Sequence, residues 1–314
     1  MLDWTDRHCR FFMRLLSKRA LLYTEMITTG ALIHGDQSRF LQHNPQEHPV
    51  ALQLGGSDPK ELAICTKLAI EHGYDEVNLN VGCPSDRVQN NKIGACLMAM
   101  PNKVAHAISA MKDVAGSTPI TVKHRIGIDG YESYAHLVDF VGKIAEAGCN
   151  VFIVHARIAI LAGLSPKQNR DIPPLRYDIV EQLTHDFPHL QFILNGGIKD
   201  LAECRQHLTT FDGVMLGRAA YHDSYLLAEV DQQLFGDTTP IITRLEVLQN
   251  MRDYILEHVE SGGKVTHITK HMLGLVHQCK GARLFRQLLS SDIHQAKNPL
   301  DVYDQAVDLL DQYE

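Results

Sequence analysis

The sequence lacks cysteine pairs at the spacings that bind metals or build a disulfide framework. Its seven cysteines lie far apart, and no two of them form a CxxC motif. Structural zinc sites usually take two ligands from such a motif, and small secreted scaffolds depend on several paired cysteines. An odd, scattered set is typical of reduced thiols, so we expect a cytoplasmic protein with no metal site.

No apolar run approaches the roughly 20 residues that cross a bilayer. The opening MLDWTDR is also too polar for a signal peptide. With 45% hydrophobic and 21% charged residues, the composition is that of an ordinary globular protein. We therefore expect no membrane partner, and we expect a monomer.

Acidic residues are absent from one segment, although the whole chain carries a net charge of −7. The stretch from Gly262 to Ser291 has no Asp or Glu but has five Lys or Arg and three His residues. Lys280, Arg283 and Arg286 recur at every third position and are expected to share a helical face. A solvated helix is one interpretation; the missing acids favour a surface that faces a polyanion.

Short β-rich runs alternate with amphipathic stretches along most of the chain. The predicted strands are 22–26, 50–54, 76–81, 119–124, 150–155, 191–195 and 213–217, and helices are predicted at 101–115 and 131–147. Such alternation predicts a parallel sheet, either an open doubly wound sheet or a TIM (β/α)8 barrel. A span of about 220 residues favours the barrel, and the lack of GxGxxG after the first strand disfavours a dinucleotide-binding fold.

The two ends of the chain depart from a simple barrel. Only seven strands are predicted, and the chain opens with a loop and helix between Asp3 and Leu16, so we expect the first strand to lie upstream of Met1. After the linker-like segment 236–240, helices are predicted at 241–258, 264–277, 282–290 and 299–312. We therefore predict a catalytic barrel over 1–235 and a helical domain over 236–314.

Polar residues recur at the ends of successive predicted strands. The ends of parallel barrel strands gather at the catalytic mouth, whereas core packing alone would not require polar groups there. The residues in question are Gln53, Asn78, Asn80, Lys123, Arg125, His155, Asn195 and Arg218.

Two glycine-containing turns follow the last two predicted strands. They are Asn195-Gly196-Gly197 and Leu216-Gly217-Arg218. Glycine lets backbone N–H groups approach an anion closely, and a following helix start adds partial positive charge. Either turn alone could be only a tight connection, but the two together favour a phosphate site.

Three of the strand-end side chains suit a conjugated ring such as a flavin. A lysine like Lys123 can stabilise a reduced, anionic ring, His155 can donate to ring or phosphate oxygens, and Gln53 can bond an amide edge. Each of them could equally be a satisfied structural side chain.

Cys83 lies in the stretch Asn78-Leu79-Asn80-Val81-Gly82-Cys83-Pro84, just after a predicted strand. It has no partners at metal-ligand spacing, and a buried structural thiol would be ordinary. Gly82 and Pro84 instead suggest an exposed loop at the catalytic end. This favours a proton donor or nucleophile, with Asn80 orienting the substrate.

Taken together, these motifs resemble the tRNA-dihydrouridine synthases over essentially the whole chain. NxNxGCP is the most specific of them. The others are the DWTD opening at 3–6, Gln53, KHR at 123–125, HAR at 155–157, NGG at 195–197 and GR at 217–218. The opening MLDWTDRHCR and the loop SPKQNRDIPPLRYD at 165–178 resemble the branch that acts on uridines 20 and 20a of the tRNA D-loop.

The resemblance implies an FMN-containing TIM barrel followed by a helical tRNA-binding domain, with NADPH as the reductant. It implies that Cys83 is the general acid and that Asn80 touches the substrate base. Lys280, Arg283 and Arg286 would contact tRNA from the helical domain, and Lys167 and Arg170 from the barrel. The implied FMN ligands are Gln53, Lys123, His155, Asn195, Gly196, Gly197, Gly217 and Arg218.

This chemistry is physically consistent. Hydride addition at C6 of uracil builds negative charge towards C5, so a proton must arrive there. A thiol with an ordinary pKa near 8.5 is mostly protonated at neutral pH and can supply it. A base in a folded loop must also be flipped out to react, which accounts for an RNA-binding appendage.

Two alternatives remain at this point. An FMN barrel acting on a free pyrimidine would not need the acid-free segment. A non-catalytic RNA-binding barrel would follow if the missing first strand abolished FMN binding, because that strand helps to hold the flavin in the family.

Overall fold

The computed structural model of the protein describes residues 1–85 and 92–313. The chain forms two compact units. We call Tyr23–Gln42 with Val50–Leu216 the barrel unit. Met1–Leu22, His43–Pro49 and Gly217–Glu314 form the helical unit.

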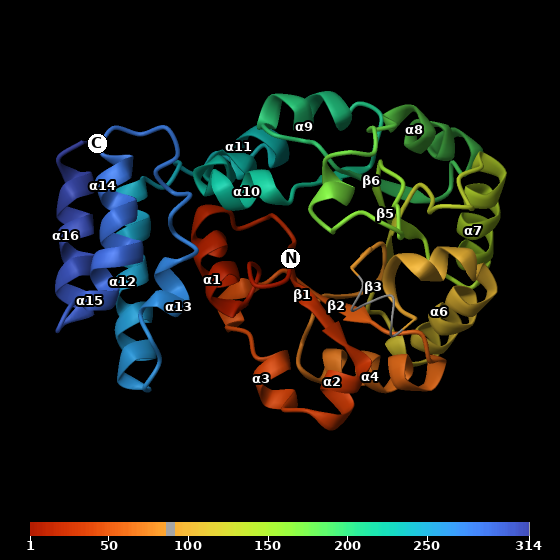
Figure 1. Cartoon of the computed structure of the whole chain (residues 1–314), viewed down its shortest axis with the longest axis horizontal. Coiled ribbons are helices and arrows are strands. Elements are labelled where there is room, and N and C mark those ends of the chain that lie inside the picture. The colour runs from red at the N-terminus through yellow and green to blue at the C-terminus, as the bar shows by residue number, and fades with distance from the viewer. Residues whose placement is uncertain (86–91, 314) are drawn as a thin grey trace. The chain divides into compact units, whose positions relative to one another are not determined.

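The barrel unit is built on a curled sheet of seven strands in chain order (Figure 1). The strands are β1 (Leu22–Thr28), β2 (Val50–Gly55), β3 (Glu76–Val81), β4 (Ile120–Arg125), β5 (Val151–His155), β6 (Gln191–Asn195) and β7 (Gly213–Met215). Neighbouring strands from β2 to β7 are parallel. The fold is TIM-barrel-like, and all seven predicted strands are confirmed.

Helices alternate with the strands and cover the outside of the sheet (Figure 1). They are α2 (Thr29–His34), α3 (Gln37–Leu41), α4 (Pro59–Glu71), α6 (Pro101–Ala115), α7 (Tyr134–Glu146), α8 (Tyr177–Asp186) and α9 (Leu201–His207). Residues next to the first turn determine where these helices begin. Asp58 caps α4 by accepting from the N–H groups of Lys60 and Glu61, with Pro59 in the first turn.

Alternation along the strands separates the two faces of the sheet. The His124 ring lies 5.2 Å from the Phe140 ring of α7, so His124 points outward to the helices. Lys123 and Arg125 therefore point to the interior, because successive strand residues face opposite sides. The same rule separates fully buried Val77 and Leu79 from the polar residues of β3. The barrel interior is thus lined by polar side chains at the strand ends.

The helical unit contains no strand among its described residues apart from Leu22, the first residue of β1. Its α-helices are α1 (Arg7–Leu16), α10 (Arg218–His222), α11 (Val230–Phe235), α12 (Arg244–Glu260), α13 (Thr266–Thr269), α14 (Ala282–Gln287), α15 (Ile293–Gln295) and α16 (Pro299–Asp311). Further turns are the 3-10 helices Pro45–Glu47 and Ser224–Glu229 and the π-helix Leu288–Asp292. None of the described helices is long and apolar enough to cross a membrane.

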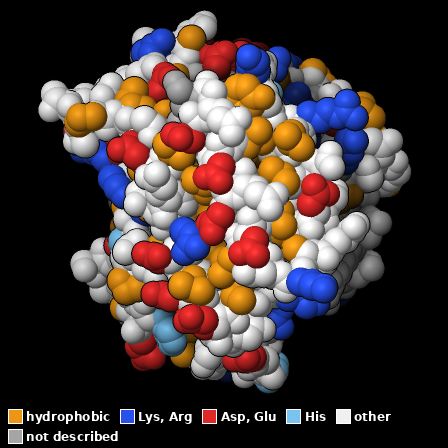
Figure 2. All heavy atoms as spheres, turned by 90° about the vertical axis from the view of Figure 1, so that its left-hand side faces the viewer, with side chains coloured by type: hydrophobic (Ala, Val, Ile, Leu, Met, Phe, Trp, Pro, Cys, Tyr) orange, Lys and Arg blue, Asp and Glu red, His pale blue; other side chains and the backbone are white. Residues whose placement is uncertain are grey.

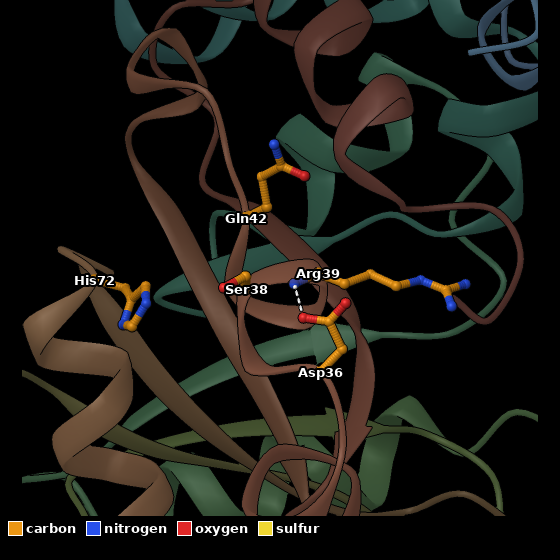
Figure 3. A pocket seen from close by; sticks show the side chains of 5 residues that line it. All are labelled: Asp36, Ser38, Arg39, Gln42 and His72. Atoms are coloured by element: carbon orange, nitrogen blue, oxygen red, sulfur yellow. Dashed lines mark hydrogen bonds between the residues drawn. The ribbon is translucent and has the colours of Figure 1, made fainter. Parts of the chain in front are cut away.

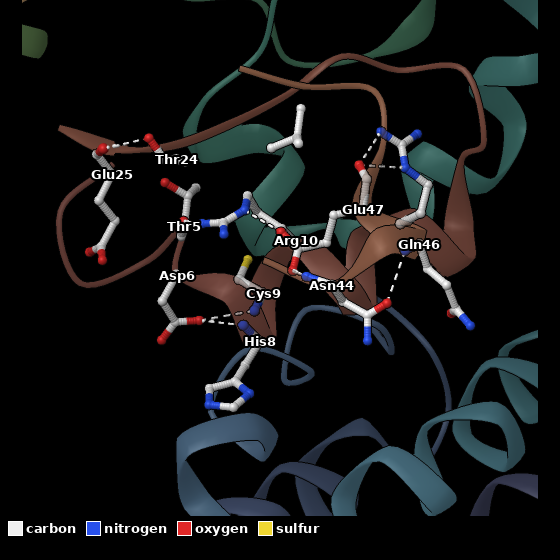
Figure 4. Close-up of polar contacts among 12 residues, drawn as sticks. Thr5, Asp6, His8, Cys9, Arg10, Thr24, Glu25, Asn44, Gln46 and Glu47 are labelled. Atoms are coloured by element: carbon white, nitrogen blue, oxygen red, sulfur yellow. Dashed lines mark hydrogen bonds and ion pairs between the residues drawn. The ribbon is translucent and has the colours of Figure 1, made fainter. Parts of the chain in front are cut away.

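Polar contacts tie α1 into the helical unit (Figure 4). Asp6 caps α1 by accepting from the N–H groups of His8 and Cys9, each at 3.0 Å. Arg10 Nε donates to Glu47 Oε2 at 2.6 Å in an ion pair buried from solvent. The first residues of the chain and residues 43–49 are therefore held in this unit by specific bonds.

The compact units differ from the predicted domains, because Met1–Leu22, His43–Pro49 and Gly217–Phe235 pack with the C-terminal helices. Assignment of catalysis to 1–235 and of tRNA binding to 236–314 stays a prediction.

The helix predicted at 264–277 is wrong except for the single turn of α13. The backbone there makes successive bonds between residues three apart, such as His271 N–H to Ile268 O and Leu275 N–H to Met272 O. Gly274 shows why a regular helix does not continue. A Cβ on it would lie 2.5 Å from the carbonyl oxygen of Tyr221, so the backbone here is pressed against α10.

The prediction that Lys280, Arg283 and Arg286 share one helical face is also wrong. Lys280 lies before α14, because Gly281 at φ +79° forms the N-cap. Only Arg283 and Arg286 are on that helix. The other helices predicted in this region are confirmed, with a π-helical turn ending the one that starts at α14.

Candidate functional site

Strand register brings the predicted site residues of the barrel together at the carboxyl ends of β2 to β6. Gln53 pairs with Asn78, and Asn80 pairs with Lys123. His155 pairs with Asn195. Because parallel strands end at the same rim, these side chains form one continuous polar surface.

The amides of this surface are bonded to one another. Asn80 Nδ2 donates to Gln53 Oε1 at 2.8 Å, and Gln53 Nε2 donates to Asn78 Oδ1 at 2.9 Å. All three side chains are buried. Each amide therefore has a fixed orientation, and Asn80 and Gln53 each keep one further N–H that these bonds do not use.

Cys83 is held at the end of β3 through its backbone. Its N–H and that of Gly82 both donate to Asn80 Oδ1 at 3.0 Å. Its carbonyl accepts from the N–H of Ala95 at 2.9 Å. The half-buried thiol donates to Ser85 Oγ at 3.7 Å. The thiol thus sits on a backbone fixed from both sides, beside the Asn80 amide.

Lys123 and Asn195 form the second part of the site. Lys123 Nζ donates to Asn195 Oδ1 at 3.0 Å, and Asn195 Nδ2 donates to the carbonyl of Met215 at 2.8 Å. Burial and the nearby Arg125 lower the pKa of Lys123 to about 8, with Cys83 opposing this shift. The amine is therefore largely cationic at neutral pH but close to its titration point.

His155 lies against the glycine turn that follows β6. Gly196 has φ +108°, and a Cβ on it would come 3.1 Å from Cε1 of His155. Gly197 has φ +81°, and a Cβ on it would come 2.4 Å from Leu175. Tyr177 OH donates to the carbonyl of Gly196 at 2.6 Å. Both positions therefore need glycine, and the turn brings backbone close to the His155 ring.

Arg125 has a role that the sequence did not indicate. Its Nε donates to the carbonyl of Gly82 at 3.1 Å, and its Nη1 donates to the carbonyls of Ile158 at 3.0 Å and Asn169 at 2.9 Å. One buried guanidinium thus fastens the loop that carries Cys83 to the long loop after β5. Its position on the inner face of β4 was the available signal.

Other residues behind the site were also missed. Asn169 is fully buried and holds its loop by accepting from the N–H of Ile160 at 2.8 Å. Glu76 and Thr121 lie on the inner faces of β3 and β4, bonded to each other at 2.6 Å. The i, i+2 spacing of Glu76, Asn78 and Asn80 could have identified that face.

The remaining predicted contacts are distributed over both units. Lys167 is exposed and Arg170 half-buried, on the loop after β5 in the barrel unit. Gly217 and Arg218 begin α10 in the helical unit. Their roles in cofactor or RNA binding stay predictions.

Basic and histidine side chains of the acid-free segment, residues 262–291, pair with acidic residues from other parts of the helical unit. Asp6 lies 3.0 Å from His271 and 3.4 Å from Lys270, and Asp223 lies 3.3 Å from His277. Arg286 is half-buried and donates to the carbonyl of Leu273.

Lys280 and Arg283 remain exposed in this segment. On the face where α16 and its neighbours lie, acidic and apolar side chains are intermixed and basic groups lie mostly towards the margins (Figure 2). The basic character of the helical unit is therefore local.

A surface hollow of about 460 Å³ lies in another part of the barrel unit (Figure 3). It is lined by Asp36, Ser38, Arg39, Gln42 and His72. His72 follows α4 and precedes β3, so this hollow is at the amino ends of the strands. Asp36 is engaged there as the cap of α3, accepting from the N–H of Arg39 at 3.1 Å. Reactive groups gather at the opposite ends in such folds.

No group of three or more His, Cys, Asp or Glu side chains with metal-binding geometry is present in residues 1–85 and 92–313. The side chains at the strand ends offer a thiol, amides, an imidazole, an amine and a guanidinium. This is a TIM-barrel-like protein with a thiol and polar side chains at the carboxyl ends of its strands.

Comparison with known proteins identifies the family. A sequence profile for dihydrouridine synthase (Dus) matches residues 1–311. The tRNA-dihydrouridine(20/20a) synthase of Pseudomonas putida is 68% identical over 99% of this chain and 92% of its own length. The enzyme of that name from Vibrio vulnificus is 56% identical over 98% of this chain and 94% of its own length. The chain belongs to the dihydrouridine synthase family.

Solved structures confirm the fold at much lower identity. Morphinone reductase superposes with a TM-score of 0.53 at 12% identity, over 76% of this chain and 83% of its own. Its complex with tetrahydroNAD gives a TM-score of 0.52 at 11% identity, over 76% and 84%.

Proposed function

We propose that the protein reduces uridine to dihydrouridine in the D-loop of tRNA, at positions 20 and 20a, using FMN and NADPH. The observation that carries this is the fixed thiol of Cys83 beside the Asn80 amide, at the rim of a barrel in the dihydrouridine synthase family. The names of the relatives support the two positions.

The barrel residues fit a flavin. The cationic Lys123 suits the pyrimidine edge of a ring that gains negative charge, and the second N–H of Gln53 suits a ring carbonyl. Gly196 and Gly197 have positive φ and carry no Cβ, so the backbone of this turn can approach a ligand closely. We assign the ring edge to Gln53 and Lys123, and the remaining contacts to His155, Asn195, Gly196 and Gly197. Gly217 and Arg218 are proposed phosphate ligands on the strength of the family resemblance.

When bound and reduced, FMN supplies hydride for C6 of the uracil ring. Asn80 presents an N–H to a carbonyl of the base, which polarises the ring and orients it. Cys83 holds a proton on Sγ and delivers it to C5, so that the C5–C6 double bond becomes single and two hydrogens are gained. Arg125 keeps the Cys83 loop in place through Gly82.

Exposed basic residues supply the RNA-binding part of the proposal. Arg283 and Lys280 in the helical unit, and Lys167 in the barrel unit, are exposed cations suited to phosphate contacts. Arg170, on the loop after β5, and Arg286, on α14, are half-buried and are assigned supporting contacts. The protein would then recognise its substrate by shape and charge rather than by the target base alone.

The substrate is tested by comparing unmodified tRNA with free uridine, using purified protein reconstituted with FMN. We expect dihydrouridine at positions 20 and 20a of the tRNA and much slower reaction of the nucleoside. Comparable rates would favour a free-pyrimidine reductase. A protein that cannot be reconstituted with FMN would instead favour an RNA-binding barrel without catalysis.

The role of Cys83 is tested by Cys83→Ala, with Cys96→Ala as the control for a half-buried thiol outside the site. Loss of a general acid is expected to slow dihydrouridine formation by about 10²–10⁴-fold. Reduction of the bound flavin by NADPH should be unchanged, as followed by flavin absorbance in the absence of tRNA. Full turnover by Cys83→Ala would contradict the assignment.

A further inference from the structure

Cys83 begins a chain of hydrogen bonds that crosses the inner face of the sheet. Its N–H donates to Asn80 Oδ1 at 3.0 Å, and Asn80 Nδ2 donates to Gln53 Oε1 at 2.8 Å. Gln53 Nε2 then donates to Asn78 Oδ1 at 2.9 Å. Each amide accepts on its oxygen and donates from its nitrogen, always in the same direction.

This chain of hydrogen bonds continues away from the rim and ends on a carboxylate. Asn78 Nδ2 donates to Thr121 Oγ1 at 2.8 Å, and Thr121 Oγ1 donates to Glu76 Oε1 at 2.6 Å. Tyr23 OH donates to the same oxygen at 2.6 Å from the other side. Glu76 is 8% exposed and Thr121 1% exposed, so water cannot replace these links easily.

The direction of the chain follows from its final acceptor. An ionised carboxylate can only accept, so Thr121 must give its single proton to Glu76 and accept from the nitrogen of Asn78. Asn78 must then turn its oxygen to Gln53. The same logic turns the oxygen of Gln53 to Asn80, and that of Asn80 to the backbone N–H groups.

We propose that Glu76 is a positioning residue, whose carboxylate fixes the direction of this chain and so holds the Asn80 amide and the Cys83 backbone in the orientation that the reaction uses. The reversed chain would place the Asn80 nitrogen against two N–H donors. That would leave buried donors unsatisfied and release the loop.

The surroundings of Glu76 are compatible with this role. Burial raises the pKa of Glu76 above its ordinary value, and the hydrogen bonds from Thr121 and Tyr23 offset part of that rise by stabilising the carboxylate. The other titratable groups that interact with it are Tyr23 on β1 and Cys149 just before β5. Burial raises the pKa of both, that of Cys149 to about 12. Both are neutral at pH 7, so they leave the carboxylate as the acceptor.

The direction also determines what the site offers a ligand. With its oxygen committed to the loop, Asn80 can present only an N–H outward, and Gln53 keeps one N–H as well. Two donors suit the carbonyl oxygens of uracil and of a flavin ring, which is the part of the inference that rests on the proposed function. Glu76 is four side chains away from the thiol loop and touches neither ligand in this proposal.

The test interrupts the hydrogen-bond chain with Thr121→Val, which keeps the shape of the side chain and removes its hydroxyl. Thr66→Val is the matched control, because Thr66 is also fully buried in the barrel unit and bonds only to Leu62 O of its own helix. Tyr23→Phe is the control beyond the carboxylate, since it removes a donor to Glu76 but leaves the chain to Cys83 intact. Thr121→Ser tests rescue by a hydroxyl.

Two readouts use the flavin-bound protein without tRNA. One is hydrogen exchange of the peptide containing Gly82 and Cys83, and the other is the rate of iodoacetamide alkylation at Cys83, both followed by mass spectrometry. We expect Thr121→Val to raise both by about tenfold, because it removes the two buried hydrogen bonds that join Asn78 to Glu76 and so frees the amides that hold the loop. Thr121→Ser, Thr66→Val and Tyr23→Phe should stay within about twofold of the wild type.

Equal exchange and alkylation in Thr121→Val and Thr66→Val would overturn the proposal. If Thr121→Val does not fold, Glu76→Gln replaces it, because glutamine keeps the shape but can donate as well as accept. Faster exchange at Gly82 and Cys83 in that variant supports the role of the carboxylate, and unchanged exchange refutes it. These readouts need no RNA, so a failure of the proposed tRNA reaction would be seen separately, in turnover of the wild type.

Discussion

The barrel unit buries a network of neutral and charged side chains on its inner sheet face, whereas the helical unit combines one buried ion pair, Arg10 with Glu47, with charged pairs at its surface. In the barrel unit, polar groups are buried on the inner sheet face and bonded to each other, as Asn78 and Thr121 are. In the helical unit, many of the charged pairs lie at the surface, such as Arg252 with Asp304, whose side chains are 44% and 40% exposed. Buried networks are costly to leave half-satisfied, whereas exposed pairs contribute little. The barrel interior should therefore be far less tolerant of change.

Arg125→Lys should have the largest effect on stability. Lysine keeps the charge but cannot bond to Gly82, Ile158 and Asn169 at once. Losing charge-assisted bonds to buried carbonyls should lower the free energy of unfolding by about 2–4 kcal/mol. Urea unfolding followed by circular dichroism measures this. A loss below about 1 kcal/mol would show that the three bonds from Arg125 are not needed for stability. Lys143→Arg, on the surface of α7, is the control.

His8→Asn tests a buried polar group in the helical unit. His8 Nδ1 lies 2.8 Å from Tyr254 OH, and burial lowers the pKa of His8 to about 3, with Asp6 opposing. The unfolded chain therefore binds more protons than the folded one between pH 6.5 and 3. The contribution of neutral His8 to the free energy of unfolding is complete above pH 6.5 and is lost as the pH falls towards 3.

The His8→Asn variant keeps an amide near Tyr254 but has no titrating group at this position. As the pH falls, its free energy of unfolding should therefore decrease less steeply than that of the wild type, with slopes that differ by up to about 1.4 kcal/mol per pH unit. Trp4, the only tryptophan, stacks on Tyr221 at 4.4 Å and reports unfolding of this unit by fluorescence. His185→Asn, at an exposed position of α8, is the control for replacing a surface histidine by asparagine. Identical slopes for wild type and His8→Asn would contradict the prediction.

Arg283→Ala tests the exposed basic surface of the helical unit. Removing one phosphate contact should weaken tRNA binding by about two- to fivefold and reduce the slope of log K against log salt by about one. Electrophoretic mobility shifts at several salt concentrations measure both. Arg252→Ala, an arginine of the same unit paired with Asp304, should bind tRNA as the wild type does. Equal losses in the two variants would remove the special role of the acid-free segment.

The smallest effect is expected for the Arg252–Asp304 pair itself. Its bonds are short, at 2.8 Å, but the pair is exposed to solvent. A double-mutant cycle with alanine should give a coupling free energy of about 0–1 kcal/mol. A coupling as large as the Arg125 effect would erase the difference between the two units.

The same contrast explains which features could be predicted from the sequence. Strand positions fix both the neighbours and the facing of a side chain, so the pairing of Asn80 with Lys123 and of His155 with Asn195 was accessible. Arg125 was visible at a strand end, but its three carbonyl partners come from loops whose paths no periodicity encodes. Asn169 was missed for the same reason.

The helical unit was harder to predict because its contacts join distant segments. Asp6 lies 265 residues from His271 in the chain, yet the two are bonded. Local pattern therefore assigned the first 22 residues to the barrel and extended a helix through Gly274. Propensity and periodicity contain no information about a backbone pressed against another helix.

The one-way chain from Cys83 to Glu76 also constrains how the sequence can change over time. Because every member's orientation depends on the next, a substitution that reverses one amide forces changes at the others. Effects of replacing Gln53, Asn78 and Thr121 should then be strongly non-additive, with a second break costing less than the first. Such epistasis would make the inner face of this sheet evolve as a single block, while the surface helices drift position by position.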